Sequence, residues 1–156
     1  MLTDLCQELK NWFDRNMPKL FGAFSIHDNN IYAVSADGSE TPLSERGLVT
    51  NQYYRIIGSK FNDGVHKYDA SETLVTEQFN DGAVWFMAVP PAVVALAARI
   101  DAWVDKYGDT SASPFTSESF GGYSYTKSAG TSGANGAGGA TWQSAFKSDL
   151  NKWRKL

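Results

Sequence analysis

The chain has 156 residues, of which 42% are hydrophobic and 20% are charged, as expected for a globular protein with a hydrophobic core. The net charge of −3 argues against a general nucleic-acid binder, which needs a basic surface. The single cysteine excludes a disulfide within the chain, and the lack of a run of about 18 apolar residues predicts no membrane span.

The first predicted element is a helix at residues 3–16, where apolar residues recur on one face at helical spacing. Thr3 or Asp4 can cap its first turn, and Pro18 is expected to end it. The apolar face consists of Leu5, Leu9, Trp12 and Phe13. We expect this helix to pack on the core, with Cys6 as a small buried residue. Its polar start also predicts no secretory signal.

Residues 21–79 are predicted to be rich in β-structure, because short apolar runs alternate with turn-forming residues. The expected turns lie at 27–30, 37–38 and 61–65. The expected strands lie at 24–26, 31–34, 52–58, 65–68 and 73–76. Such a series favours a small antiparallel barrel or a curled sheet.

The next predicted element is an amphipathic helix that begins near Pro91 and ends at Gly108. Its buried stripe has spacings of four, three and four residues, which place the apolar side chains on one face. The stripe consists of Leu96, Ile100, Trp103 and Tyr107.

Residues 108–140 contain no helical or strand periodicity, and we expect a long flexible loop or arm there. Within this loop, the run 117–127 alternates serines and glycines with three aromatic residues. Such a run can lie extended and press its rings into a neighbouring molecule.

The last predicted element is a helix at 141–156, with Thr141 as its cap and basic residues at its end. Its apolar face consists of Trp142, Phe146, Leu150 and Trp153. Two interpretations remain open: a core helix with a solvated basic flank, or a helix that docks on a partner protein. The tryptophans and the preceding glycine tract favour docking.

No motif of enzyme or metal chemistry is present. The two histidines, His27 and His66, have no ligand-spaced Cys, His or Glu partner, and there is no Gly-x-Ser-x-Gly elbow. The glycine tract 130–139 lacks the lysine of a phosphate-binding loop. Asp101 and Asp105 lie on the expected solvent face of a helix. We therefore predict no enzymatic activity, no catalytic residues, no metal and no cofactor.

Two segments carry a resemblance to a known family. The run Ser117–Lys127 and the ending Trp142–Leu156, together with the order helix, helix, long loop, helix, resemble the siphophage-type head–tail connectors (adaptors) of tailed-bacteriophage necks. The runs 54–65 and 81–90 are similar to a subset of these proteins from phages of Gram-positive bacteria.

The resemblance, combined with the predicted elements, implies an α+β fold in a single domain, 1–156. The expected core is a small helical bundle made of the N-terminal, central and C-terminal helices. A β-rich, barrel-like insertion at 21–79 would interrupt this bundle. The flexible loop or arm at 108–140 would precede a C-terminal docking helix at 141–156.

The resemblance also implies a structural function. Connectors form a ring, here expected to have about twelve copies, under the portal of the phage head. The ring extends the DNA channel and joins head to tail. The implied partners are the portal protein, the next neck or tail protein (a stopper or tail-completion protein) and other copies of the chain. DNA would pass through the lumen without sequence-specific binding. The chain would be made in the host cytoplasm and reside in the virion neck.

The resemblance directs two groups of residues toward partners. The portal-facing group consists of Trp142, Phe146, Leu150, Trp153, Arg154 and Lys155. The inter-subunit or portal loop group consists of Ser117, Ser119, Phe120, Gly121, Gly122, Tyr123, Ser124, Tyr125 and Lys127.

Two alternatives remain from the sequence. The first is another phage head-completion or tail protein. The second is a small β-barrel ligand-binding module, which would use Tyr32, Tyr53, Tyr54 and Tyr68.

Overall fold

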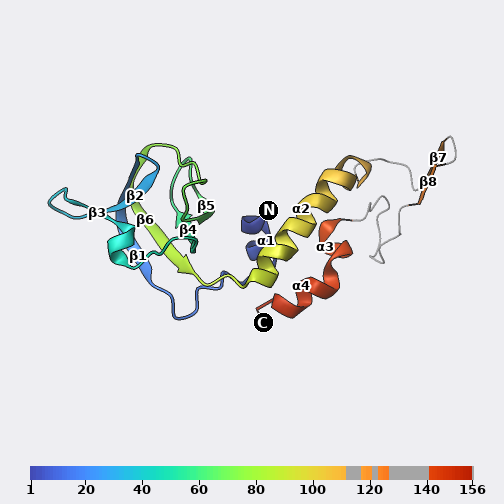
Figure 1. Ribbon diagram of the computed structural model, residues 1–156, viewed down its shortest axis with the longest axis horizontal. Helices are drawn as coiled ribbons and strands as arrows, with labels where there is room; N and C mark the ends of the chain where they lie inside the picture. Colours follow the sequence, from blue (N-terminus) through green and yellow to red (C-terminus); the bar gives the residue numbers. More distant parts are fainter. Residues whose placement is uncertain (112–116, 121–122, 127–140, 156) are drawn as a thin grey trace. The chain divides into compact units, whose positions relative to one another are not determined.

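The computed structural model describes residues 1–111, 117–120, 123–126 and 141–155. The chain divides into two compact units (Figure 1). The sheet unit takes Asn11–Pro90 together with Leu2, and the helical unit takes Met1, Thr3–Lys10 and Pro91–Leu156. The sheet unit is thus inserted in the sequence between the first helix and the remaining helices.

The sheet unit is built on six strands whose neighbours are all antiparallel. The strands are β1 (Lys19–His27), β2 (Asn30–Val34), β3 (Glu40–Pro42), β4 (Tyr53–Ile57), β5 (Gly64–Lys67) and β6 (Glu77–Met87). Their order in the sheet is β3-β2-β1-β6-β4-β5, so β3 and β5 are edges and the sheet is open. A 3-10 helix, η1 (Leu43–Arg46), follows β3.

Most of the predicted β-structure is confirmed. Asp28 and Asn29, at φ 50° and 57°, form the tight turn between β1 and β2, and Gly38, at φ 82°, lies in the turn before β3. The strands predicted at 52–58 and 65–68 correspond to β4 and β5. The strand predicted at 73–76 is absent from the described structure, and the long strand β6 begins at Glu77 instead.

The central strand β6 has 11 residues and pairs with β1 on one side and β4 on the other. Its register against β1 shifts between Gly22 and Phe24, and Asp81 adopts a φ of 55° at this bulge. The extra residue moves Phe79 onto the same face as Val84 and Phe86, although their spacing is odd. All three side chains therefore enter one core.

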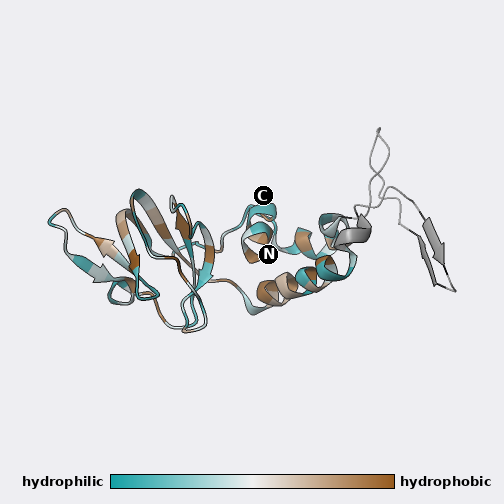
Figure 2. Ribbon diagram, turned by 90° about the horizontal axis from the view of Figure 1, so that it is seen from above, coloured by the Kyte–Doolittle hydropathy of each residue, from teal (hydrophilic) through white to brown (hydrophobic). Residues whose placement is uncertain are grey.

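The core of the sheet unit forms on one face of the sheet, where inward residues of β4 alternate with more exposed ones. Its fully or nearly fully buried members are Phe24, Ile26, Ile31, Leu43, Leu48, Tyr54, Ile56, Phe79, Val84 and Phe86. Figure 2 shows brown, hydrophobic segments alternating with teal ones along the strands.

The predicted helix 3–16 is wrong beyond Glu8. The first helix, α1, covers only Leu2–Glu8, because Lys10, Phe13 and Asn16 adopt positive φ angles that no continuous helix allows. The chain instead runs along the end of β6, where the N–H of Ala88 donates to the carbonyl of Phe13 at 2.8 Å.

Trp12, predicted on the helix face, belongs to the sheet unit. The Arg55 guanidinium lies 3.6 Å from the centroid of its ring and 5.4 Å from that of Trp85. The Lys19 ammonium lies 4.3 Å from the Trp85 ring and 2.5 Å from the Asp14 carboxylate. These stacked cations and rings fix the segment after α1 to the sheet.

The helical unit contains α1, α2 (Pro91–Ser111), α3 (Trp142–Ala145) and α4 (Lys147–Trp153). The predicted start at Pro91 is confirmed, because a proline at the first helical position needs no N–H partner. Leu96 and Ile100 are buried as predicted, and the rings of Trp103 and Tyr107 lie 5.5 Å apart. The predicted end at Gly108 is wrong, since α2 continues to Ser111.

Two further strands lie in the sequence between α2 and α3. The strands β7 (Ser117–Phe120) and β8 (Tyr123–Thr126) pair antiparallel, with Ser117 opposite Thr126. This pair differs from the expectation of no regular structure at 108–140. Its alternating serines and aromatic residues match the two-residue period of a strand. The other residues of 112–140 lie outside the described structure.

The predicted fold class therefore needs correction. The protein is not a helical bundle with a barrel-like insertion, because a six-stranded open antiparallel sheet dominates and α1, α3 and α4 are short. Only the coarse class, mixed α and β, is compatible with the structure. No strand is predicted over Glu77–Met87, where the long strand β6 lies, because the bulged strand lacks the regular alternation of the other strands.

The close approach at Gly82 provides a test of the bulged strand. A Cβ at this position would lie 2.5 Å from the Phe79 ring and 3.0 Å from the Ile57 carbonyl oxygen. We expect Gly82→Ala to lower the free energy of unfolding by about 3 kcal/mol, because a ring and a backbone group must both move. Urea unfolding followed by circular dichroism measures this change.

The control is Gly38→Ala, which has positive φ but no atom within 4 Å of the added Cβ. Its cost should be about 1 kcal/mol, from backbone strain alone. Equal costs for the two variants would contradict the packing of Phe79 over Gly82.

Candidate partner-binding site

The C-terminal segment contains two short helices instead of the single helix predicted at 141–156. The predicted cap is confirmed, since the N–H of Ser144 donates to the side-chain oxygen of Thr141 at 3.3 Å. The helix is interrupted at Phe146, where φ is −106° and ψ is 15°. Beyond this residue α4 continues to Trp153.

Part of the apolar face of this segment packs within the helical unit. Leu150 is 2% exposed, and the Phe146 ring meets the Trp103 ring edge-on at 6.5 Å. The Arg99 guanidinium lies 5.3 Å from the Phe146 ring and 3.2 Å from the Asp149 carboxylate. Leu150 is therefore covered by the protein itself, and Phe146 is half-covered.

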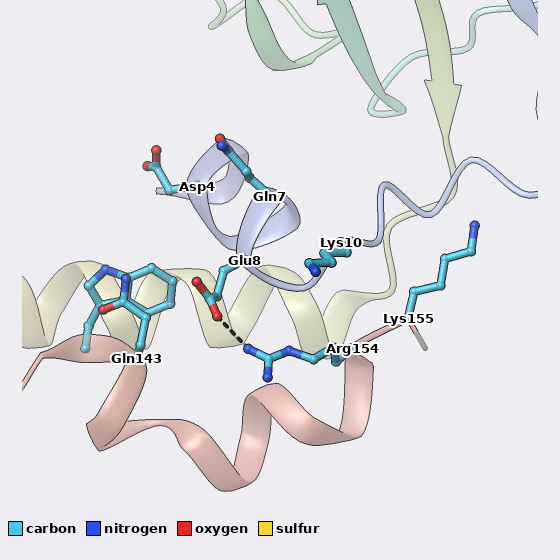
Figure 3. Close-up of a pocket in the computed structure, with 8 residues that line it drawn as sticks. Asp4, Gln7, Glu8, Lys10, Gln143, Arg154 and Lys155 are labelled. Carbon is cyan, nitrogen blue, oxygen red and sulfur yellow. Dashed lines mark hydrogen bonds and ion pairs between the residues drawn. The ribbon is translucent and has the colours of Figure 1, made fainter. Parts of the chain in front are cut away.

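The end of α4 is attached to the end of α1. The backbone N–H of Lys155 donates to the carbonyl of Leu9 at 3.0 Å, which satisfies an acceptor just beyond the last turn of α1. The Arg154 guanidinium donates to the Glu8 carboxylate at 2.5 Å. Figure 3 shows Glu8 and Arg154 pointing toward each other between the two helices.

An open cleft of about 960 Å³ lies around this ion pair. Its lining residues come from α1 and the residues just after it, from α3 and from the end of the chain after α4. They are Asp4, Gln7, Glu8, Lys10, Trp142, Gln143, Arg154 and Lys155. Three of the six residues that the resemblance directs toward the portal, Trp142, Arg154 and Lys155, therefore come together at one place. Figure 3 shows Gln143 near one end of the cleft and Lys155 at the other.

The cleft has the chemistry of a protein-binding groove more than that of a small-molecule pocket. Trp142 is its single aromatic residue and the other seven are polar or charged, whereas small-molecule pockets are mostly apolar. None of the lining residues is a histidine, cysteine or serine that could act as a nucleophile or metal ligand. In the described part of the chain, no group of three potential metal ligands occurs.

A polar network in the sheet unit forms a second candidate surface. The Glu77 carboxylate accepts hydrogen bonds from the Ser59 hydroxyl, from the N–H of Lys60 at 2.7 Å and from the Asn62 amide at 3.2 Å. The Asn62 side chain also exchanges two hydrogen bonds with the backbone of Val75, at 2.8 and 2.9 Å. These bonds join the loop before β5 to the loop before β6.

Two apolar side chains beside this network, Phe61 and Val75, are exposed to solvent. Phe61 is 59% exposed and Val75 is 51% exposed, although Ser59 and Asn62 beside them are buried. The Lys60 ammonium lies 5.0 Å from the Phe61 ring. The exposed pair is small, and single exposed apolar residues are common on soluble proteins.

The histidines have structural partners. The His66 ring nitrogens lie 2.7 Å from the Glu72 carboxylate and 2.7 Å from the Asn62 carbonyl, so this side chain also supports the loops. His27 lies 2.8 Å from Glu40, and hydrogen bonds to Glu40 and then Asp28 raise its pKa above the ordinary value.

The four tyrosines of the alternative ligand-binding module do not form one exposed face. Tyr54 is 1% exposed, and burial raises its phenol pKa well above the ordinary value. Tyr53, the next residue along β4, points to the opposite face of the sheet. The Tyr32 ring is stacked on His27 at 4.3 Å.

The remaining predicted partner residues are placed only in part. Ser117, Ser119 and Phe120 belong to β7, and Tyr123, Ser124 and Tyr125 belong to β8. Gly121, Gly122 and Lys127, and the side chains of both strands, lie outside the described structure. Trp153 is half-buried at the end of α4.

Five of the cleft residues were not predicted as site residues: Asp4, Gln7, Glu8, Lys10 and Gln143. Four of them lie in the first helix or just after it, where the sequence indicates an apolar face and a helix cap but no binding residue, and Gln143 lies in α3. Their role depends on a contact between chain positions 146 residues apart, which no local pattern reveals.

No protein-family model, curated protein or solved structure matches this chain. Within the described residues, no helix is long and apolar enough to cross a bilayer.

Leu150 tests whether α4 is part of the folded helical unit. Replacing Leu150 with Ala should lower the free energy of unfolding by about 2–5 kcal/mol, because the site is closed on all sides and a cavity would remain. Lys147→Ala, an exposed change on the same helix, should alter stability by less than about 0.5 kcal/mol. Urea titration of both variants provides the comparison, and equal stabilities would show that α4 is detached in solution.

Glu77 gives the loop network a dependence on pH. Burial opposes ionisation of this carboxyl, but hydrogen bonds from Ser59, Lys60, Phe61 and Asn62 hold its pKa below the ordinary value of 4.5. A lowered pKa adds stability that is fully present above the unfolded-state value and is lost as pH falls through the folded-state value. Glu77→Gln should therefore cost about 2 kcal/mol near neutral pH, the size of a charge-assisted hydrogen bond.

The difference between the two proteins should shrink when pH falls from about 6 to about 3, because wild-type Glu77 becomes protonated. Urea unfolding at several pH values measures it. Glu45→Gln, at an exposed position of η1 outside this network, serves as the control for the loss of one negative charge. A difference for Glu77→Gln that does not depend on pH would refute the role of the charge.

Proposed function

We propose that this chain is a structural head–tail connector of a tailed bacteriophage. In this proposal, a ring of about twelve copies lies under the portal, extends the DNA channel and joins the head to the tail. Its partners are the portal protein, the next neck or tail protein and neighbouring copies, and DNA passes through the ring without sequence-specific binding. The chain acts in the virion neck and has no enzymatic role.

The observation that carries this proposal is the resemblance of two segments, 117–127 and 142–156, to the connector family. The second segment closes on Trp153, Arg154, Lys155 and Leu156, which resemble the aromatic residue, basic pair and aliphatic residue of the family's C-terminal helix.

The geometry of the helical unit is consistent with such a role. Leu150 and Phe146 anchor the C-terminal segment on its own unit, while Trp142, Arg154 and Lys155 line an open cleft. A connector needs a partner-binding surface on a rigid body, because ordering a loose helix on binding would weaken the attachment. The anchored segment therefore differs from the tethered helix that the sequence predicted, and it presents its basic end without leaving the fold.

An amber mutation in the gene tests the proposal in the phage itself. Under non-permissive conditions we expect DNA-filled heads and free tails to accumulate separately in lysates, as seen by electron microscopy. Supplying the full chain from a plasmid should restore joined particles. Joined, infectious particles in the absence of the chain would exclude the connector function.

Quantitative mass spectrometry of purified virions gives an independent result. A connector ring predicts about twelve copies in each particle. Absence of the chain from virions would exclude every structural role in the neck, whereas a copy number far from twelve would favour another head-completion or tail protein.

A further inference from the structure

The charges around the cleft of the helical unit are not balanced. Arg154 and Glu8 pair with each other at 2.5 Å, and the Asp4 carboxylate lies 3.4 Å from the amino group of Met1. Two lysines remain, Lys10 and Lys155, and neither forms an ion pair within the described part of the chain. The cleft is therefore locally positive in a chain whose net charge is −3.

We propose that this cleft binds an acidic segment of the portal protein, with Lys10 and Lys155 meeting its carboxylates and the Trp142 ring forming an apolar wall. The inference rests on the proposed connector function, and it adds the chemistry of the segment that the site accepts. An acidic polypeptide fits better than a small anion, because Lys10, Lys155 and Trp142 come from three separate segments of the chain around a cleft of about 960 Å³.

The Glu8–Arg154 pair has a positioning role in this arrangement. Together with the hydrogen bond from Lys155 N–H to the Leu9 carbonyl, it fixes the chain end against α1. The backbone at Lys155 is thus held in place, while Figure 3 shows its side chain extending away from the ion pair. A fixed backbone with a free ammonium group can meet a carboxylate without first ordering the chain end.

A second copy of the chain is the main competing occupant, since its net charge is negative. The portal is favoured because three of the residues that the resemblance directs toward it line this one cleft. A ring contact between copies would also require a different, complementary patch on each side of every subunit.

The test uses the full chain and the purified portal protein of the same phage, with binding measured by biolayer interferometry at several salt concentrations. Lys155→Glu and Lys10→Glu should each weaken binding about tenfold at low ionic strength, because the change places like charges together. The effect should shrink as salt rises. Lys147→Glu is the matched control, since Lys147 is exposed on α4 but does not line the cleft, and it should change binding less than about twofold.

Trp142→Ala should weaken binding at all salt concentrations, since an apolar contact is not screened. Peptides that tile the acidic segments of the portal should compete with the intact portal, and their Gln and Asn counterparts should not. Portal variants with Lys in place of the implicated Glu or Asp should recover binding to Lys155→Glu.

Three outcomes would overturn the inference. The first is that Lys155→Glu and Lys10→Glu bind the portal as tightly as wild type. The second is that Lys147→Glu weakens portal binding as much as they do. The third is that wild type does not bind the portal but self-associates in a way that depends on the two lysines. Each can occur in a protein that is present in virions and required for joining, in which case the connector function stands and only the cleft inference fails. Urea unfolding of each variant confirms that the fold is intact.

Discussion

The sheet unit depends on one irregularity, the bulge in β6 at Asp81. A regular strand would place Phe79 on the face opposite Val84 and Phe86, because their spacing is odd. The extra residue reverses this alternation, and all three side chains reach the same core. The bulge in turn needs Gly82, since the Phe79 ring and the Ile57 carbonyl occupy the space of a Cβ there. Because of this one bulge, β6 can pair with both β1 and β4 and still direct Phe79, Val84 and Phe86 into the core of the sheet unit.

The bulge also explains which parts of the fold can be read from the sequence. The β1–β2 hairpin and β4 follow regular alternation and turn chemistry, and these were predicted correctly. The bulged strand β6 has no regular alternation of apolar and polar residues, so no strand was predicted there. The tetrapeptide Phe-Asn-Asp-Gly occurs at 61–64 and again at 79–82. Phe61 is 59% exposed in a loop and Phe79 is 7% exposed in a strand, so neighbours across the sheet decide the outcome.

In the candidate site, too, features set by residues close in the sequence could be predicted, and features set by contacts between distant residues could not. Thr141 as a cap and the apolar face around Leu150 follow from spacing within one segment. The end of α1 at Glu8 does not follow from local spacing, because Lys10, Phe13 and Asn16 adopt positive φ and the Trp12 ring stacks on Arg55, a residue 43 positions away in the sequence. The partnership of Glu8 with Arg154 joins the two ends of the printed sequence, and only the folded helical unit brings them together. The basic ending was visible in the sequence, but the cleft around it was not.

These contacts give the chain end two separate tasks. Leu150 and Phe146 supply stability, because their burial removes apolar surface from water. The contacts of Phe146 with Trp103 and of Asp149 with Arg99 hold the C-terminal segment against α2. The exposed ion pair contributes little to stability by itself, about 0.2–1 kcal/mol for pairs of this kind. Its value is geometric, because it holds the chain end that leaves α4 at Arg154 and Lys155 against α1. In the proposed arrangement, the cleft would recognise the partner by charge while the core beneath it stays unchanged. Because Leu150 and Phe146 pack within the helical unit while Arg154 and Lys155 line the cleft, the C-terminal segment can be part of the fold and still present the basic residues that the proposed binding role requires.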